Sequence, residues 1–124
     1  MKNVEKLEER VIDFTVMVNK ISTTLPKTRT CFYLSDQIIR SSISTSLNYA
    51  EARNAESRKD FIHKMKIVLK ELRETIAALK IITKLNLNKD ENVLKQALNE
   101  NNELISIFVK SIDTARKNID INNS

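Results

Sequence analysis

The sequence predicts an all-α protein folded as an antiparallel up-down four-helix bundle, and three observations support this prediction. The 124 residues include no Gly and a single Pro, although sheet proteins use both residues at hairpins and bulges. Four long segments carry apolar residues at alternating spacings of three and four, which is typical of a helix with one buried face. The links between these segments are short, which favours antiparallel neighbours. The length suits one domain, over residues 1–124.

The first helix is predicted over about residues 3–25. Pro26 ends it, because the residue before a proline avoids the helical region of backbone space. The apolar face of this helix has no gap and consists of Val4, Leu7, Val11, Phe14, Val18, Ile21 and Leu25.

The second helix is predicted over 29–53, with Thr28 or Thr30 as its N-cap. Its apolar face is weaker and consists of Phe32, Ile39, Ile43, Leu47 and Ala50. A run of hydroxyl side chains lies within it: Ser41, Ser42, Ser44, Thr45 and Ser46. Hydroxyls disfavour a free helix, so we expect the run to pack against other helices, including a second copy of the chain. The alternative is that these hydroxyls contact phosphates.

The third helix is predicted over 58–87, where Ser57 and Asp60 resemble a capping box at its start. Its apolar face consists of Phe61, Met65, Val68, Leu72, Thr75, Leu79 and Ile82, widened by Ile62, Leu69 and Ile76.

The fourth helix is predicted over 89–119 and opens with the capping pair Asn88 and Glu91. Its inner face consists of Leu94, Leu98, Asn101, Ile105, Phe108, Ile112, Ala115 and Ile119. Four large side chains are expected to be buried across the bundle: Phe14, Phe61, Leu72 and Phe108.

The net charge of +5 comes from the third helix, because residues 57–88 hold eight basic and three acidic groups. Six of the basic residues lie about 200° from the apolar face, and we call them the basic stripe: Lys59, Lys66, Lys70, Arg73, Lys80 and Lys84. A solvated helix face would explain such a line. However, few acids are interleaved with it, which favours an anionic partner, above all the phosphates of nucleic acid. Tyr49 is the one nearby aromatic residue that could stack on a base.

The sequence does not predict an enzyme, a cofactor or a metal. Phosphate-binding loops need Gly, and the chain has none. Cys31 and His63 are each the only residue of their type, and we expect them to be structural or solvated rather than a nucleophile and its base. No Glu-x-x-His pair supports a di-iron site. The N-terminus lacks a signal peptide and no apolar run could span a bilayer, which predicts a cytoplasmic location without membrane contact.

One segment resembles a known family. The stretch "QIIRSSISTSLNYAEARNAESRKDFIHKMKIVLKELRET", residues 37–75, is similar to the central part of four-helix-bundle proteins related to the 23S rRNA intervening-sequence-encoded protein. The matching positions are Gln37, Arg40, Ser44, Asn48, Ala50, Glu51, Ser57, Asp60, Phe61, Glu71 and Glu74. Six of these form a motif that we expect to be structural: Arg40, Asn48, Glu51, Ser57, Asp60 and Phe61. Asn48 and Glu51 lie three apart and are expected to join a hydrogen-bond network that fixes helix register.

The resemblance implies a bacterial protein of largely unestablished activity. The accessory variability protein of diversity-generating retroelements is similar in fold. The resemblance to these proteins implies a homopentamer. It also implies nucleic acid, a reverse transcriptase or a ribosomal component as partners. This chain has Ala52 where the family pattern has Gly, so Asn54 is expected to take the left-handed conformation that ends the helix.

We therefore expect a non-enzymatic, homo-oligomeric nucleic-acid-binding accessory protein that uses the basic stripe. Self-association is expected to use the surface around Ser41–Ser46 together with Ile67 and Ile81, which the core face of the third helix leaves over. The alternative is a helical protein–protein adaptor with no nucleic-acid role.

Overall fold

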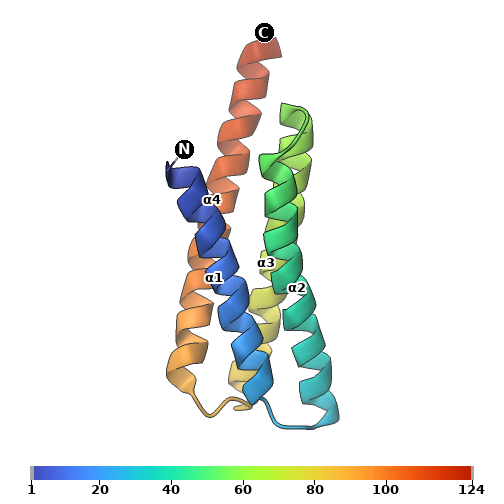
Figure 1. Cartoon of the computed structure of the whole chain (residues 1–124), viewed down its shortest axis with the longest axis vertical. Coiled ribbons are helices and arrows are strands. Elements are labelled where there is room, and N and C mark those ends of the chain that lie inside the picture. The colour runs from blue at the N-terminus through green and yellow to red at the C-terminus, as the bar shows by residue number, and fades with distance from the viewer. Residues whose placement is uncertain (1, 124) are drawn as a thin grey trace.

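The computed structural model describes the backbone of residues 2–123 and the side chains of residues 6–118. Within this range the chain forms four helices, α1 (Lys2–Thr24), α2 (Arg29–Arg53), α3 (Arg58–Lys84) and α4 (Glu91–Asn123). Each helix packs on its neighbour along the chain, and α1 also packs on α4. Figure 1 shows the resulting up-down bundle, with both ends of the chain at the same end of it. None of the helices in the described part is long and apolar enough to cross a membrane.

Local capping chemistry sets the starts of the helices. The Thr28 side chain accepts a hydrogen bond from the Cys31 backbone N at 3.2 Å, and the Ser57 side chain accepts one from the Asp60 N at 3.0 Å. Both residues were expected to cap. The prediction of Asn88 as the cap of α4 was wrong. Asp90 caps α4, because its Oδ1 accepts from the backbone N of the second and third helical residues at 3.2 Å.

The ends of α2 and α3 differ from the prediction. Asn54 is not left-handed, since its φ is −107°. Its backbone N donates to the Glu51 carbonyl at 3.1 Å, a tightened last turn that needs no left-handed residue. Among the described residues the positive φ belongs to Asn86, at 53°, just beyond α3. Because α3 ends at Lys84, the link to α4 is longer than expected.

The core confirms the predicted faces of α1, α3 and α4. Phe14, Leu72 and Phe108 are fully buried. Phe61, however, is only half-buried, and the prediction that it would be buried was wrong. At this end of α3 the neighbouring Ile62 turns inward instead. The side chain of Ile119 lies outside the described residues, as does that of Val4.

Helix α2 has the opposite arrangement from the one predicted. Phe32 and Leu47 are 57% and 63% exposed, so the predicted apolar face of α2 points out of the bundle. The buried face instead consists of Cys31, Leu34, Ile38, Ser41, Ser42, Thr45, Tyr49 and Ala52. This difference arises because hydroxyl groups of the run form hydrogen bonds with other residues of the same chain.

Hydroxyl pairs join α2 to both of its neighbours. Ser41 Oγ lies 2.6 Å from Thr75 Oγ1 of α3, and Ser46 Oγ lies 2.6 Å from Thr15 Oγ1 of α1. Thr15 also donates to the Ser42 carbonyl at 2.8 Å. Small hydroxyl side chains let the helices approach closely, as expected. The partner helices belong to the same chain, however, so the expectation that this run meets a second copy was wrong for its buried members. The buried hydroxyls cannot reach phosphates either.

We expect Ser42→Leu to lower the free energy of unfolding by about 1–3 kcal/mol, because the larger side chain must displace α1 from a tightly packed contact. Chemical denaturation measures this change. Ser106→Leu, at an exposed position on α4, is the matched control and should be nearly neutral. Equal stability of the two variants would show that the hydroxyl layer is loosely packed.

The other two helix contacts contain polar groups as well. Asn101 is fully buried between α4 and α3. With its amide oriented to satisfy both groups, Nδ2 donates to the Leu72 carbonyl at 3.0 Å and Oδ1 accepts from the Ile76 N at 3.1 Å. The α1–α4 contact is the least extensive of the four. Arg10 of α1 bridges it, with its Nε donating to Glu100 Oε2 at 2.7 Å and its Nη2 pairing with Glu103.

Candidate nucleic-acid interface

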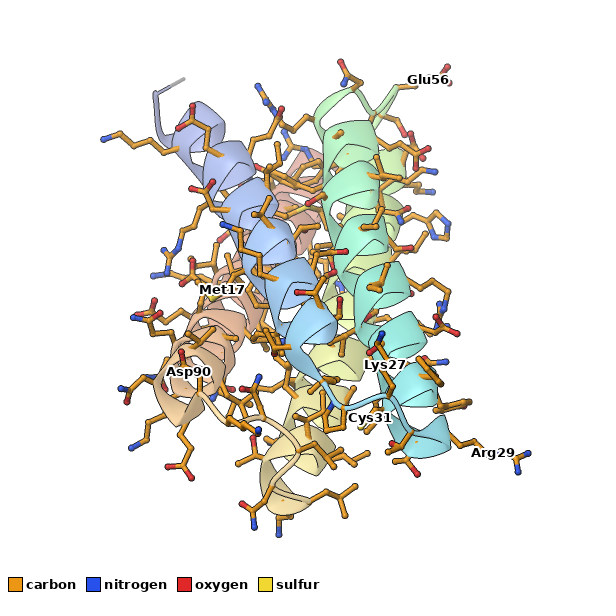
Figure 2. All side chains as sticks on the ribbon, turned by 60° about the horizontal axis from the view of Figure 1, so that its bottom comes forward. Met17, Lys27, Arg29, Cys31, Glu56 and Asp90 are labelled. Carbon is orange, nitrogen blue, oxygen red and sulfur yellow. The ribbon has the colours of Figure 1, made fainter. Side chains whose placement is uncertain are left out.

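All six residues of the basic stripe are exposed on α3: Lys59, Lys66, Lys70, Arg73, Lys80 and Lys84. They lie on the side of the helix away from its buried face, as the spacing predicted. None of the ion pairs among the described residues involves any of the six. Figure 2 shows how such long charged side chains project from the bundle into solvent. The stripe is therefore available to an external anion.

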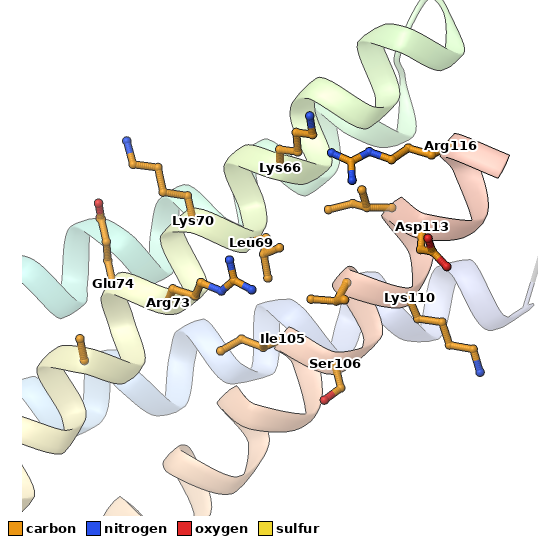
Figure 3. A pocket seen from close by; sticks show the side chains of 13 residues that line it. Lys66, Leu69, Lys70, Arg73, Glu74, Ile105, Ser106, Lys110, Asp113 and Arg116 are labelled. Atoms are coloured by element: carbon orange, nitrogen blue, oxygen red, sulfur yellow. The ribbon is translucent and has the colours of Figure 1, made fainter. Parts of the chain in front are cut away.

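Half of the stripe also lines a groove between α3 and α4. The groove has a volume of about 1040 Å³, and Lys66, Lys70 and Arg73 line its α3 side. Lys110 and Arg116 line the α4 side. Figure 3 shows Arg73 and Arg116 reaching toward the groove from the two helices. Lys59, Lys80 and Lys84 lie outside this groove, farther along α3.

The groove has an excess of positive charge because its two acids are engaged elsewhere. Glu74 Oε2 lies 3.7 Å from Arg40 Nη2 of α2, and Asp113 Oδ2 lies 3.1 Å from Lys117 Nζ. The five cations that line the groove have no ion-pair partner among the described residues. Grouped like charges without counter-charges produce a positive potential that attracts anions.

The sequence did not point to the two cations of α4. Residues 89–124 hold five basic and six acidic groups, so this segment has a slightly negative net charge. The signal that could have revealed Lys110 and Arg116 is the i,i+4 pair between Asp113 and Lys117, which removes that acid from the balance. Their position beside α3 depends on how the helices pack.

The floor of the groove is apolar and consists of Leu69, Ala77, Ile105, Val109 and Ile112. None of the described residues that line the groove is aromatic. The expectation that Tyr49 could stack on a base was wrong, because its ring is buried edge-on against Phe108, with the centroids 5.2 Å apart. Burial also raises the pKa of the Tyr49 hydroxyl. Contacts to nucleic acid would therefore be made to the backbone rather than by stacking on bases.

Of the motif residues of α2, Arg40 and Glu51 form ion pairs with α3, whereas Asn48 bonds within its own helix. Arg40 Nη2 donates a hydrogen bond to Gln37 Oε1 at 2.8 Å. Glu51 Oε2 pairs with Lys64 Nζ of α3 at 3.1 Å, whereas Asn48 Nδ2 donates within α2 to the Ser44 carbonyl at 2.8 Å. Asn48 and Glu51 thus have separate partners, and the expected shared network is not seen among the described hydrogen bonds. Asp60 Oδ2 accepts from the Glu56 N at 3.3 Å, one residue earlier than in a standard capping box.

Cys31 and His63 lie at opposite ends of the bundle. Cys31 is buried in the first turn of α2, near the α1–α2 link, as Figure 2 shows. His63 is exposed near the start of α3, at the other end. The fold therefore does not bring the two side chains together as nucleophile and base. Within residues 6–118 no three His, Cys, Asp or Glu side chains are grouped so that they could hold a metal ion.

Glu71 is a buried acid beside the stripe. It is 8% exposed, and its Oε2 has no hydrogen-bond partner among the described atoms. Burial raises the pKa of Glu71, and the neighbouring Glu74 raises it further, while Arg40 and Lys70 oppose this change. The folded state therefore binds a proton at Glu71 more tightly than the unfolded state does.

This buried acid predicts a pH-dependent stability. A raised folded-state pKa contributes stability at low pH that is lost as the pH rises through that pKa. Glu71→Gln should thus raise the free energy of unfolding at neutral pH and flatten its decline between acidic and neutral pH. Urea unfolding across this range measures both effects, with Glu91→Gln at an exposed position as the control. A parallel decline in wild type and Glu71→Gln would contradict the assignment.

The comparisons with known proteins agree with this fold. A family model described as 23S rRNA-intervening sequence protein matches residues 6–110, a range that includes the whole basic stripe. A similar solved structure is that of a protein of unknown function from the S23 ribosomal protein family of Bacteroides thetaiotaomicron VPI-5482. It is 29% identical, has a TM-score of 0.80, and the alignment covers 91% of this chain and 99% of that one. No curated protein matches the chain.

Proposed function

Because the chain belongs to the 23S rRNA-intervening sequence protein family, we propose that it is a non-enzymatic, homo-oligomeric accessory protein that binds nucleic acid. The observation that carries the proposal is the basic stripe, whose six exposed cations have no carboxylate partner in the described part of the chain. The family description names an insertion in ribosomal RNA, which makes RNA the first polymer to test.

The geometry of the stripe suits a phosphate backbone. Its residues run from Lys59 to Lys84, which at about 1.5 Å per residue is nearly 40 Å along the helix. Lys66 and Lys70 are like charges four residues apart, an arrangement that costs a few tenths of a kcal/mol and that a bound phosphate would relieve. Such contacts fix the position of a strand without reading its bases. Lys110 and Arg116 add two cations beside the middle of the stripe.

This mode of binding predicts a steep dependence on salt. Each phosphate contact lowers the slope of log affinity against log salt by about 0.9 for duplex DNA and about 0.7 for single strands. We expect a slope of several units for labelled RNA titrated by fluorescence anisotropy between low and physiological salt. Binding that does not weaken with salt, or no binding at low salt, would contradict the proposal.

The assembly and its protein partners are further parts of the proposal. The resemblance implies five copies, a number that light scattering can test. A reverse transcriptase or a ribosomal component would be recruited by the assembled protein together with its nucleic acid.

The adaptor alternative has one observation in its favour, the apolar floor of the α3–α4 groove. Phosphate groups do not pack against apolar side chains, whereas a helix with an apolar and acidic face would cover this floor. An adaptor would keep its protein partner when RNA is removed by nuclease treatment.

A further inference from the structure

Two apolar surfaces of the bundle are left uncovered by the residues that the structure describes. The first lies on α1 and α2, and we call it the α1–α2 strip: Ile12, Val16, Ile43 and Leu47, all exposed. Val16 and Ile43 line one shallow hollow of about 410 Å³. Ile12 lies one turn before Val16, and Leu47 lies one turn after Ile43. Because α1 and α2 are antiparallel, these two residues extend the strip in the same direction (Figure 1).

The periodicity of the strip is that of a helix–helix contact. Ile12 and Val16 are four residues apart on α1, and Ile43 and Leu47 are four apart on α2, a spacing that places each pair on one helix face. The buried face of α2 lies on the other side and includes Ser41, Ser42 and Thr45. Scattered apolar residues on a surface need no explanation, but a periodic row across two adjacent helices indicates a binding surface.

The second surface is the α3–α4 groove, with its apolar floor. In the bundle α1 packs on α2 and α3 packs on α4, so the strip and the groove lie on opposite sides. Both surfaces are apolar and both are hollowed, with volumes of about 410 Å³ for the strip and about 1040 Å³ for the groove.

The α1–α2 strip and the α3–α4 groove are complementary in charge. Glu9 and Asp13 flank Ile12 on the exposed face of α1 and take part in none of the described ion pairs. Across the molecule, Arg73 and Arg116 extend toward the apolar floor of the groove (Figure 3). Lys20 is the cation that lines the hollow at the other end of the strip.

We propose that the α1–α2 strip of one copy packs into the α3–α4 groove of the next copy, with Glu9 and Asp13 facing Arg73 and Arg116. The contact joins two different surfaces, so it is heterologous, and each copy offers both. Such contacts continue from copy to copy and close into a ring or extend as a filament. The proposal rests on the self-association in the proposed function and does not depend on nucleic acid.

The contact is compatible with nucleic-acid binding by the remaining stripe. Lys70 points away from the groove in Figure 3, and Lys59, Lys80 and Lys84 lie outside it. Arg73 would be used between copies, so it would no longer be available to phosphate.

The test uses one variant for each surface. Leu47→Asp places a charge in the strip, and Val109→Asp places one in the groove. Each variant alone should be monomeric by light scattering at micromolar concentration without nucleic acid, whereas the wild-type protein should have a mass of several chains. Mixed in equal amounts, the two variants should form a complex of two chains, because one intact strip and one intact groove remain. Tyr33→Asp, at a residue 68% exposed outside both surfaces, is the control and should keep the wild-type mass.

Three results would overturn the proposal: a monomeric wild-type protein, a variant that keeps the wild-type mass, or two monomeric variants that do not combine. The last result would mean that the strip and the groove do not bind each other. Circular dichroism should show equal helix content in all variants, since the substituted residues are exposed. Because the masses are measured without RNA, a failure here is distinct from a failure of RNA binding.

Discussion

Reversing Lys66 and Lys70 to Glu should remove most of the RNA binding and leave the helical fold intact. Both side chains are exposed and lie on the stripe where it borders the groove, so the change replaces two attractive contacts by two repulsive ones. The affinity at low salt should fall about tenfold or more. The two lost contacts alone should make the salt slope less steep by about 1.4 for single-stranded RNA. Fluorescence anisotropy with labelled RNA measures both quantities.

The matched control changes the same net charge elsewhere. Lys27 and Lys89 are exposed in the two links at the other end of the bundle from the start of α3. Lys27→Glu combined with Lys89→Glu should weaken binding only slightly, because those positions are not on the stripe. If the Lys66 and Lys70 variant binds as well as wild type, the stripe is a solvated helix face and the adaptor alternative takes its place.

Phe108→Ala should lower the free energy of unfolding by about 3–5 kcal/mol. The ring is fully buried and packs edge-on against Tyr49, with an angle of 89° between the ring planes. Its removal leaves a cavity between α2 and α4 that the helices cannot fill without moving. Urea denaturation monitored by circular dichroism measures the loss.

Two other Phe residues provide a graded comparison. Phe61 is half-buried, so Phe61→Ala should cost less than Phe108→Ala. Phe32 is 57% exposed, and Phe32→Ala should stay within about 0.5 kcal/mol of wild type. A loss at Phe32 as large as that at Phe108 would indicate that the outward face of α2 is covered in the folded protein.

The apolar periodicity predicted the buried faces of α1, α3 and α4 and failed for α2. In α1, α3 and α4 the apolar row faces the core, so the rule that apolar means buried holds. In α2 the rule selects the wrong face, because the buried hydroxyls have hydrogen-bond partners inside the chain. Ser41 pairs with Thr75 of α3, Ser42 Oγ accepts from Asn19 Nδ2 of α1, and Thr45 donates to the Ser41 carbonyl of its own helix. An apolar row that packs against another molecule has the same spacing as one that faces the core. Sequence alone cannot separate the two cases.

The candidate site was predictable only where it lies on a single helix. The basic stripe follows from spacing within α3, and the structure places all six residues on an exposed face. The groove depends on the register between α3 and α4, which is set by contacts such as that of Asn101 with the α3 backbone. The caps show the same division. Thr28, Ser57 and Asp90 all cap residues three positions away, but which residue of the link before α4 takes this role depends on the path of that link.

The Arg10 bridge spans the side of the bundle with the fewest contacts. Contacts between α1 and α4 are the sparsest among the described helix pairs, and the ion pairs of Arg10 with Glu100 and Glu103 span them. Partly exposed ion pairs weaken as ionic strength rises, and this side has the fewest other contacts to compensate for that loss. The first cooperative unit to open in the native ensemble should therefore be α1 swinging away from α4 while it remains attached to α2. In that open state the buried faces of α1 and α4 would meet solvent before the rest of the protein unfolds.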